Sequence, residues 1–311
     1  MVFFTEPDPK LFANLKTTVD ALYRSHPGIH EPILLNSTFA EGTDQLFDYL
    51  TQERIRLAPT FLFVDPCGVN GASLTSIGKY AAEHAELFLF FNYDGINRIA
   101  GLRDGARDTL VELLGSTSDR DALISRLESC AAPQDRESCI LGFYLDLLRD
   151  RQGWTYTCPF RVEKEGRRAT SHYLIHATKH PMGFRVMKEV MWPLGHTEER
   201  PGGLMFAQAS RDPLPRLFPS EDDEPRNQIL SSLTTSKRLA NYFYRELSEQ
   251  AGNYLCERDY RPALLALESE RKIEVWDPKT GSAAPAVTRR KGKSGQRTLA
   301  GRLIVQLVAS A

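Results

Sequence analysis

The fold class is decided by one stretch of the sequence, Thr60-Phe61-Leu62-Phe63-Val64-Asp65-Pro66-Cys67-Gly68. Five uncharged, β-prone residues end at an acid and a proline, which is typical of a buried strand followed by a turn. Residues 74–84 then repeat apolar side chains at helical spacing. The stretch therefore predicts one strand–turn–helix unit.

The same unit occurs three more times around this stretch. Apolar strands that alternate with amphipathic helices indicate a parallel sheet with helices on both faces. The sequence therefore predicts an α/β domain over residues 1–197. The further strands are predicted at residues 2–5, 32–36 and 85–91, with helices at residues 10–22 and 43–51.

The second half of this domain changes from alternating elements to helices and a hairpin. Helical spacing covers residues 106–114, 120–130 and 136–151, and a later helix covers residues 181–192. Residues 155–162 and 170–177 are β-prone and flank the polar turn 165–168. We expect this hairpin to complete the far edge of the sheet.

A change of composition marks the end of the first domain. Residues 198–227 are rich in Pro, Gly and acid, including Glu221-Asp222-Asp223-Glu224, which is typical of an exposed linker. The order that follows is that of a winged helix, a helix-turn-helix variant with a β-ribbon wing, predicted over residues 228–311. Its helices are predicted at residues 236–250, 252–256 and 259–272, and its strands at residues 273–276 and 299–309, which we expect to pair.

Composition and charge restrict the function classes. The 39 basic and 40 acidic residues leave a net charge of −1, so no whole-chain field attracts nucleic acid or a membrane. No apolar run approaches the 18 or so residues that span a bilayer, and the first residues do not resemble a secretory signal. We therefore expect a cytoplasmic protein. Five widely spaced cysteines predict reduced thiols and no zinc site.

Polar residues follow each of the four predicted strands. In an open parallel sheet the ligand binds outside the carboxyl ends of the strands, so we expect these residues to share one crevice. The predicted cofactor-binding residues are Glu6, Asn36 and Asp65, and the predicted catalytic residues are Asp65, Pro66, Asn92 and Tyr93.

Two of these positions have open alternatives. An ionised Glu6 presents only acceptors, which suits a ribose diol, but an acid there also stabilises the start of the following helix. The rigid Asp65-Pro66 turn either orients a substrate amine or is a structural strand end. Cys67 is either a nucleophile at a helix start or a small half-buried residue.

A basic cluster lies near the C-terminus. No acid occurs from residue 281 to residue 311, so the cluster predicts contacts with phosphates. The predicted helix 259–272 carries charges of both signs, which leaves docking of a protein as the alternative. The predicted nucleic-acid-binding residues are Arg289, Arg290, Lys291, Lys293 and Arg297.

Four blocks of this sequence carry a family resemblance: residues 61–68, residues 89–93 with Ile96-Asn97-Arg98, residues 173–181 and residues 187–192. They resemble the signature blocks of the three-Cys-motif partner proteins. The resemblance implies a partial Rossmann-like, methyltransferase-type sheet, S-adenosylmethionine as cofactor, a C-terminal winged helix and a partner protein with a three-cysteine motif.

The chain departs from this resemblance at two places. Amino-group methyltransferases carry an Asp/Asn-Pro-Pro-aromatic tetrapeptide whose ring stacks on the target base, and Cys67 and Gly68 replace its last two residues, so Phe91 or Tyr93 would have to substitute for the ring. The family also begins with an additional strand and a Gly-rich turn, whereas this sequence begins at the element that corresponds to the second strand.

Two functions follow from these expectations. One is an S-adenosylmethionine-dependent methyltransferase-like protein that acts on nucleic acid. The other is a catalytically inactive binding or adaptor protein whose winged helix docks nucleic acid or a protein. The missing glycines favour the second, and the retained Asp65-Pro66 and Asn92 favour the first.

Overall fold

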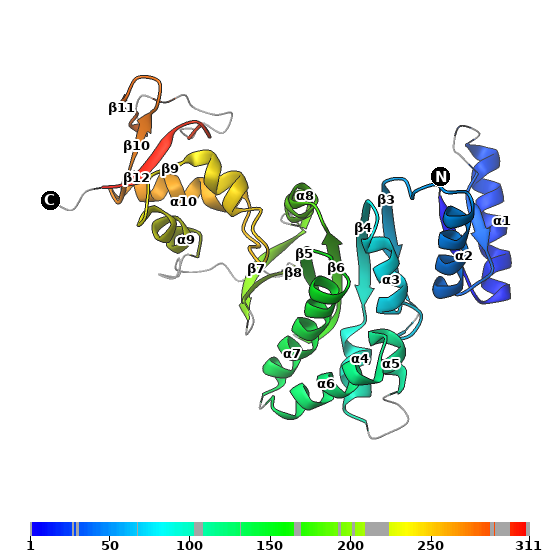
Figure 1. Cartoon of the computed structure of the whole chain (residues 1–311). Helices are drawn as coiled ribbons and strands as arrows, with labels where there is room; N and C mark the ends of the chain where they lie inside the picture. Colours follow the sequence, from blue (N-terminus) through cyan, green and yellow to red (C-terminus); the bar gives the residue numbers. More distant parts are fainter. Residues whose placement is uncertain are drawn as a thin grey trace. The chain divides into compact units, whose positions relative to one another are not determined.

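The computed structural model describes residues 2–26, 28, 31–66, 68–102, 108–130, 132–164, 169–191, 194–200, 203–208, 224–286, 289 and 299–308. The chain is a mixed α/β protein (Figure 1). It divides into two compact units, and each is described by itself. The first comprises Met1–Lys179 with Arg200–Gly203, and the second His180–Glu199 with Leu204–Ala311.

The first unit begins with a two-stranded parallel sheet and two helices. Asp8 accepts hydrogen bonds from the backbone amides of Lys10 and Leu11 and so starts the first helix, while Thr38 and Glu41 form a capping box at the second. The elements are β1 (Phe3–Thr5), α1 (Pro9–Ser25), β2 (Ile33–Leu35) and α2 (Phe39–Gln52).

The main sheet of this unit has the strand order β3-β4-β6-β5. Strands β3 (Thr60–Val64) and β4 (Ala85–Phe91) are parallel, whereas β6 (Thr170–Thr178) and β5 (Tyr156–Glu163) are antiparallel to their neighbours. The expected hairpin is therefore confirmed, but its expected place at the far edge is wrong, because β5 has a second neighbouring strand in the sheet order. Its helices are α3 (Leu74–Ala81), α4 (Tyr93–Ala100), α5 (Asp108–Leu114), α6 (Thr117–Glu128), α7 (Pro133–Asp146) and the π-helical turn η2 (Leu147–Arg151).

The prediction of one parallel sheet from the first four strands is wrong. Strands β1 and β2 pair only with each other in the described part of the chain, and β3 is the outermost strand of the main sheet. Helix α2 links the two parts, because Tyr80 of α3 contacts the rings of Phe39 and Phe47. The sequence pattern identified each strand, but pairing depends on contacts that strand propensity does not specify.

The prediction of helices on both faces of the sheet also fails at β3. Leu87 and Leu89 of β4 point to the face that the helices cover and are 0% and 2% exposed. Phe61 and Phe63 of β3 lie on the opposite face and are 61% and 59% exposed. A uniformly apolar strand predicts burial on both sides, whereas only one side of β3 is covered here.

The prediction of reduced cysteines is wrong for one pair. Cys130 and Cys139 form a disulfide. Helix α6 ends at Glu128 and α7 begins at Pro133, so a short connection brings the two sulfurs together. Cys158 and Cys256 keep their thiols and are buried, while Cys67 lies outside the described residues.

The second unit is built on helices and one antiparallel sheet of order β11-β10-β12-β9. Strand β10 pairs with β12, as the sequence predicts. Buried Phe243, Tyr260, Leu264 and Val305 belong to its core. The elements are α8 (Pro181–Met191), α9 (Glu224–Leu233), β9 (Arg238–Leu239), the π-helical segment η4 (Tyr242–Leu247), α10 (Glu257–Ser269), β10 (Ile273–Asp277), β11 (Ser282–Ala283) and β12 (Ile304–Leu307).

Three sequence expectations need correction in this part of the chain. Strands β7 (Gly195–Arg200) and β8 (Gly203–Gln208) are hydrogen-bonded neighbours where a linker was expected. The sequence pattern did not indicate them, because Pro and Gly near the apolar run from Leu204 are typical of a linker. The same predicted linker extends into α9. Residues 236–250 form β9 and η4 instead of one helix, and residues 252–256 are not helical.

A buried lysine explains why α8 belongs to the second unit. Lys188 is 0% exposed, and its ammonium donates to the carbonyls of Asn253 at 2.8 Å and Leu255 at 2.7 Å, and to that of Ser248. The ammonium also lies 4.6 Å from the ring centre of Phe184. These contacts place the division at residue 180, earlier than the boundary predicted from composition.

None of the helices in the described residues combines the length and the apolar character that crossing a membrane requires.

Candidate functional site

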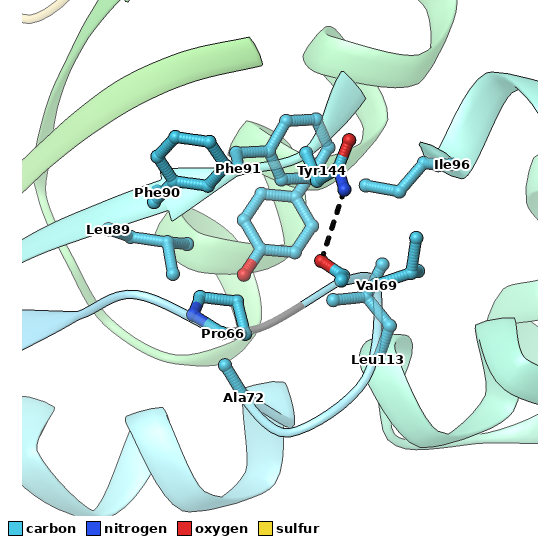
Figure 2. Close-up of a pocket in the computed structure, with 11 residues that line it drawn as sticks. Pro66, Val69, Ala72, Leu89, Phe90, Phe91, Ile96, Leu113 and Tyr144 are labelled. Atoms are coloured by element: carbon cyan, nitrogen blue, oxygen red, sulfur yellow. Dashed lines mark hydrogen bonds between the residues drawn. The ribbon is translucent and has the colours of Figure 1, made fainter. Parts of the chain in front are cut away.

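A small cavity lies at the carboxyl ends of β3 and β4 (Figure 2). Its walls are mostly apolar, and about 10 Å³ of free volume leaves room for roughly one water molecule. Pro66 and Asn92, two of the predicted catalytic residues, line it together. The full lining is Pro66, Gly68, Val69, Ala72, Leu89, Phe90, Phe91, Asn92, Ile96, Leu113 and Tyr144.

Asn92 fastens the turn after β3 to the start of α4. Its side-chain oxygen accepts from the amide of Gly95 at 3.0 Å, and its side-chain nitrogen donates to the carbonyl of Gly68 at 3.3 Å (Figure 2). Gly68 and Gly71 have φ of +117° and +100°, which favours glycine at both positions. The turn therefore has a defined conformation against the strand end.

Tyr144 of α7 supplies the polar group that the sequence did not reveal. Its side chain is 1% exposed, and its hydroxyl has no hydrogen-bond partner among the described residues. Burial raises the pKa of this hydroxyl, so it stays protonated. Figure 2 shows the hydroxyl directed toward Pro66. The sequence alone cannot distinguish a tyrosine that lines a cavity from one that only packs in the core, because both occur in an apolar helical pattern.

Replacing Tyr144 by Phe is expected to stabilise the chain by about 1–2 kcal/mol, because a buried hydroxyl without a partner loses its bonds to water. Urea denaturation of the two proteins measures the difference. The matched control is Tyr173→Phe, whose buried hydroxyl donates to Glu137 at 2.5 Å and whose loss should destabilise. A destabilised Tyr144→Phe protein would show that the hydroxyl has a partner.

The other predicted catalytic residues lie outside the cavity. Asp65 is exposed and does not line it. Tyr93 is 7% exposed and contacts Tyr173 edge-on. Phe91 lines the cavity, but it is 3% exposed and its ring centre lies 4.5 Å from that of Tyr144. The expectation that Phe91 or Tyr93 offers a stacking surface to a base is therefore wrong, since both rings are packed in the core.

The predicted cofactor-binding residues fall into two groups. Asn36 donates to the carbonyl of Glu6 at 2.8 Å, so these two residues meet at the end of the β1–β2 sheet. The Glu6 carboxylate accepts from the amide of Asp8 at 2.9 Å, which is a turn contact. Asp65 instead follows β3 in the main sheet. Glu6 and Asn36 therefore lie at one sheet and Asp65 at another, so the expected single crevice shared by these three residues is not formed.

One residue of the basic cluster is described. Arg289 is 8% exposed, and its guanidinium forms an ion pair with Glu268 of α10. Its charge is therefore paired with α10 instead of being presented at the surface. Arg290, Lys291, Lys293 and Arg297 lie outside the described residues.

The chain matches no family model, no curated protein and no solved structure with which it was compared. The resemblance to the three-Cys-motif partner proteins therefore stays a prediction. Within the described ranges, no group of three or more His, Cys, Asp or Glu side chains is arranged to hold a metal ion.

Proposed function

We propose that this chain is a nucleic-acid-binding protein in which a winged helix in the second unit contacts the phosphate backbone. The order of elements carries the proposal. Helix α9, strand β9, segment η4 and helix α10 precede β10 and β12, and the three strands pair in the antiparallel order β10-β12-β9. A winged helix has this order, and its wing is the connection between the last two strands.

The segment between β11 and β12 has the charge that a wing on nucleic acid needs. We call it the basic segment, since it contains no acid and six cationic residues: Arg289, Arg290, Lys291, Lys293, Arg297 and Arg302. Arg289 already pairs with Glu268 of α10, so its guanidinium is not counted among the phosphate contacts. We propose that Arg290, Lys291, Lys293 and Arg297 contact phosphates, which makes binding dependent on salt.

The side chains of helix α10 favour contacts with the phosphate backbone of the nucleic acid over contacts with its bases. Arg261 forms an ion pair with Glu257, and its guanidinium lies 4.9 Å from the ring centre of Tyr244. Over residues 257–272, four acids balance four basic residues. Base-specific contacts need side chains that are free to enter a groove, so we expect little sequence preference.

The proposal is tested by fluorescence anisotropy of a labelled 20-base-pair duplex titrated with the full chain at low salt. Binding that is similar for two unrelated duplex sequences supports it. Absence of binding at 100 µM protein would instead favour the adaptor function, in which the winged helix docks a protein. A partner with a three-cysteine motif belongs to that alternative.

The second candidate is an S-adenosylmethionine-dependent methyltransferase, supported by Pro66 and Asn92 side by side at the strand ends. The described residues do not fit this cofactor, because their cavity holds about one water molecule and Glu6 lies at the end of another sheet. We therefore expect no heat of binding when millimolar S-adenosylmethionine is titrated into the chain. A clear binding isotherm would restore the enzyme as the leading candidate.

A further inference from the structure

The outer edge of β3 is open for pairing in the described part of the chain. Thr60 donates its backbone amide inward, to the carbonyl of His84 at 2.9 Å. Backbone groups alternate along a strand, so Phe61 and Phe63 direct theirs outward. Edge strands are usually protected by a charge, a proline or a bulge, and residues 60–64 contain none of these.

Aromatic rings cover the sheet face beside this edge. We call Phe61, Phe63, Phe88, Phe90 and His172 the aromatic face. Phe88 of β4 lies with its ring centre 6.2 Å and 6.1 Å from those of Phe61 and Phe63, and Phe90 stacks on His172 at 4.1 Å. Phe61 and Phe63 are each more than half exposed. Exposed apolar patches of this kind mark interaction sites.

The exposed charge beside the aromatic face is negative, because Asp65 is exposed just after β3. Glu86 of β4 stands opposite Phe61 in the strand register, but its carboxylate already pairs with His176 at 2.5 Å and accepts from Thr178 at 2.9 Å. Burial lowers the pKa of His172, although the charge of Asp65 opposes the shift, so the imidazole is neutral at pH 7. A phosphate backbone would be repelled here, whereas a cation would be attracted.

We propose that the edge of β3 binds an extended, arginine-bearing segment of a partner protein, which adds a strand and places alternate side chains on the aromatic face. Main-chain pairing with Phe61 and Phe63 supplies affinity, as in other strand additions. A guanidinium is planar and weakly hydrated, so it stacks on phenyl rings while its N–H groups pair with a carboxylate such as Asp65. Lysine meets only part of these requirements.

The test uses the full chain and a labelled peptide, Thr-Arg-Thr-Arg-Thr-Arg-Thr, with anisotropy as the readout. We expect saturable binding, weaker binding of the matching lysine peptide, and none of the glutamate peptide. Asp65→Asn and Phe63→Ser should each weaken binding on the order of tenfold. The matched control is Phe4→Ser in β1, a 41% exposed phenylalanine on the other sheet, which should leave binding unchanged.

Hydrogen exchange gives the second readout. The amides of Phe61 and Phe63 should exchange more slowly when the arginine peptide is bound. The proposal is overturned by any of these results: no binding at 1 mM peptide, equal binding of arginine and lysine peptides, or unchanged binding by Asp65→Asn.

Discussion

Replacing Lys188 by Met is expected to lower the free energy of unfolding of the second unit by roughly 3–5 kcal/mol. The substitution keeps the length and apolar stem of the side chain but removes every N–H donor. The carbonyls of Ser248, Asn253 and Leu255 would then be left without their charged donor in a buried site. Each such loss costs about 1–3 kcal/mol. Urea denaturation followed by circular dichroism measures the change.

The matched control for this prediction is Lys272→Met. The Lys272 side chain is 55% exposed and pairs with Glu270 at 3.3 Å, so its loss should change stability by less than about 1 kcal/mol. Equal effects of the two substitutions would show that the buried contacts of Lys188 do not hold α8 in the second unit.

The largest expected effect on binding comes from the basic segment. Changing Arg290, Lys291, Lys293 and Arg297 to Gln should weaken duplex binding on the order of 100-fold at about 0.1 M salt, because each contact with a phosphate releases counterions. Arg289 is left unchanged, since its pair with Glu268 is part of the fold. Anisotropy titrations of the two proteins measure the ratio.

The control for this variant is removal of an equal number of charges elsewhere. Lys10, Lys16, Arg24 and Arg54 are exposed residues of the first unit, and changing them to Gln gives the same net charge. We expect nearly unchanged binding in that protein. If both variants weaken binding equally, net charge and not the basic segment determines affinity.

Local patterns predicted most elements of the chain. The structure has the expected strands at residues 60–64 and 85–91, the hairpin of β5 and β6, and the pairing of β10 with β12. The last strand is shorter than expected, because β12 covers only Ile304–Leu307 of the predicted range 299–309. Each depends on interactions between residues close in sequence or on a run of β-branched and aromatic side chains. Such signals lie within a single segment, so a single sequence contains them.

Long-range arrangement was not predictable in the same way. Strands β1 and β2 are separate from β3 because of which strand edges pair. The sequence of an apolar strand does not specify which strand it pairs with. The disulfide between Cys130 and Cys139 depends on how α6 turns into α7. The helical pattern of residues 181–192 does not mark Lys188 as buried, yet its ammonium donates to three carbonyls of distant residues.

The candidate site was predicted in part. Proline and asparagine at strand ends identified Pro66 and Asn92, which line one cavity. Tyr144 was missed because its partnerless hydroxyl is a property of the packing. Phe91 and Tyr93 were expected to face a ligand, but strand alternation turns Phe91 toward the helices and α4 packs Tyr93 on Tyr173. The exposed rings are those of Phe61 and Phe63.

The salt dependence of duplex binding tests the central claim most directly. The logarithm of the association constant is plotted against the logarithm of salt concentration for the natural chain and for the Gln variant at Arg290, Lys291, Lys293 and Arg297. We predict that the slope of the natural chain is steeper by about 3 to 4 units, since each phosphate contact contributes about 0.9. Identical slopes in the two proteins would contradict nucleic-acid binding through the second unit.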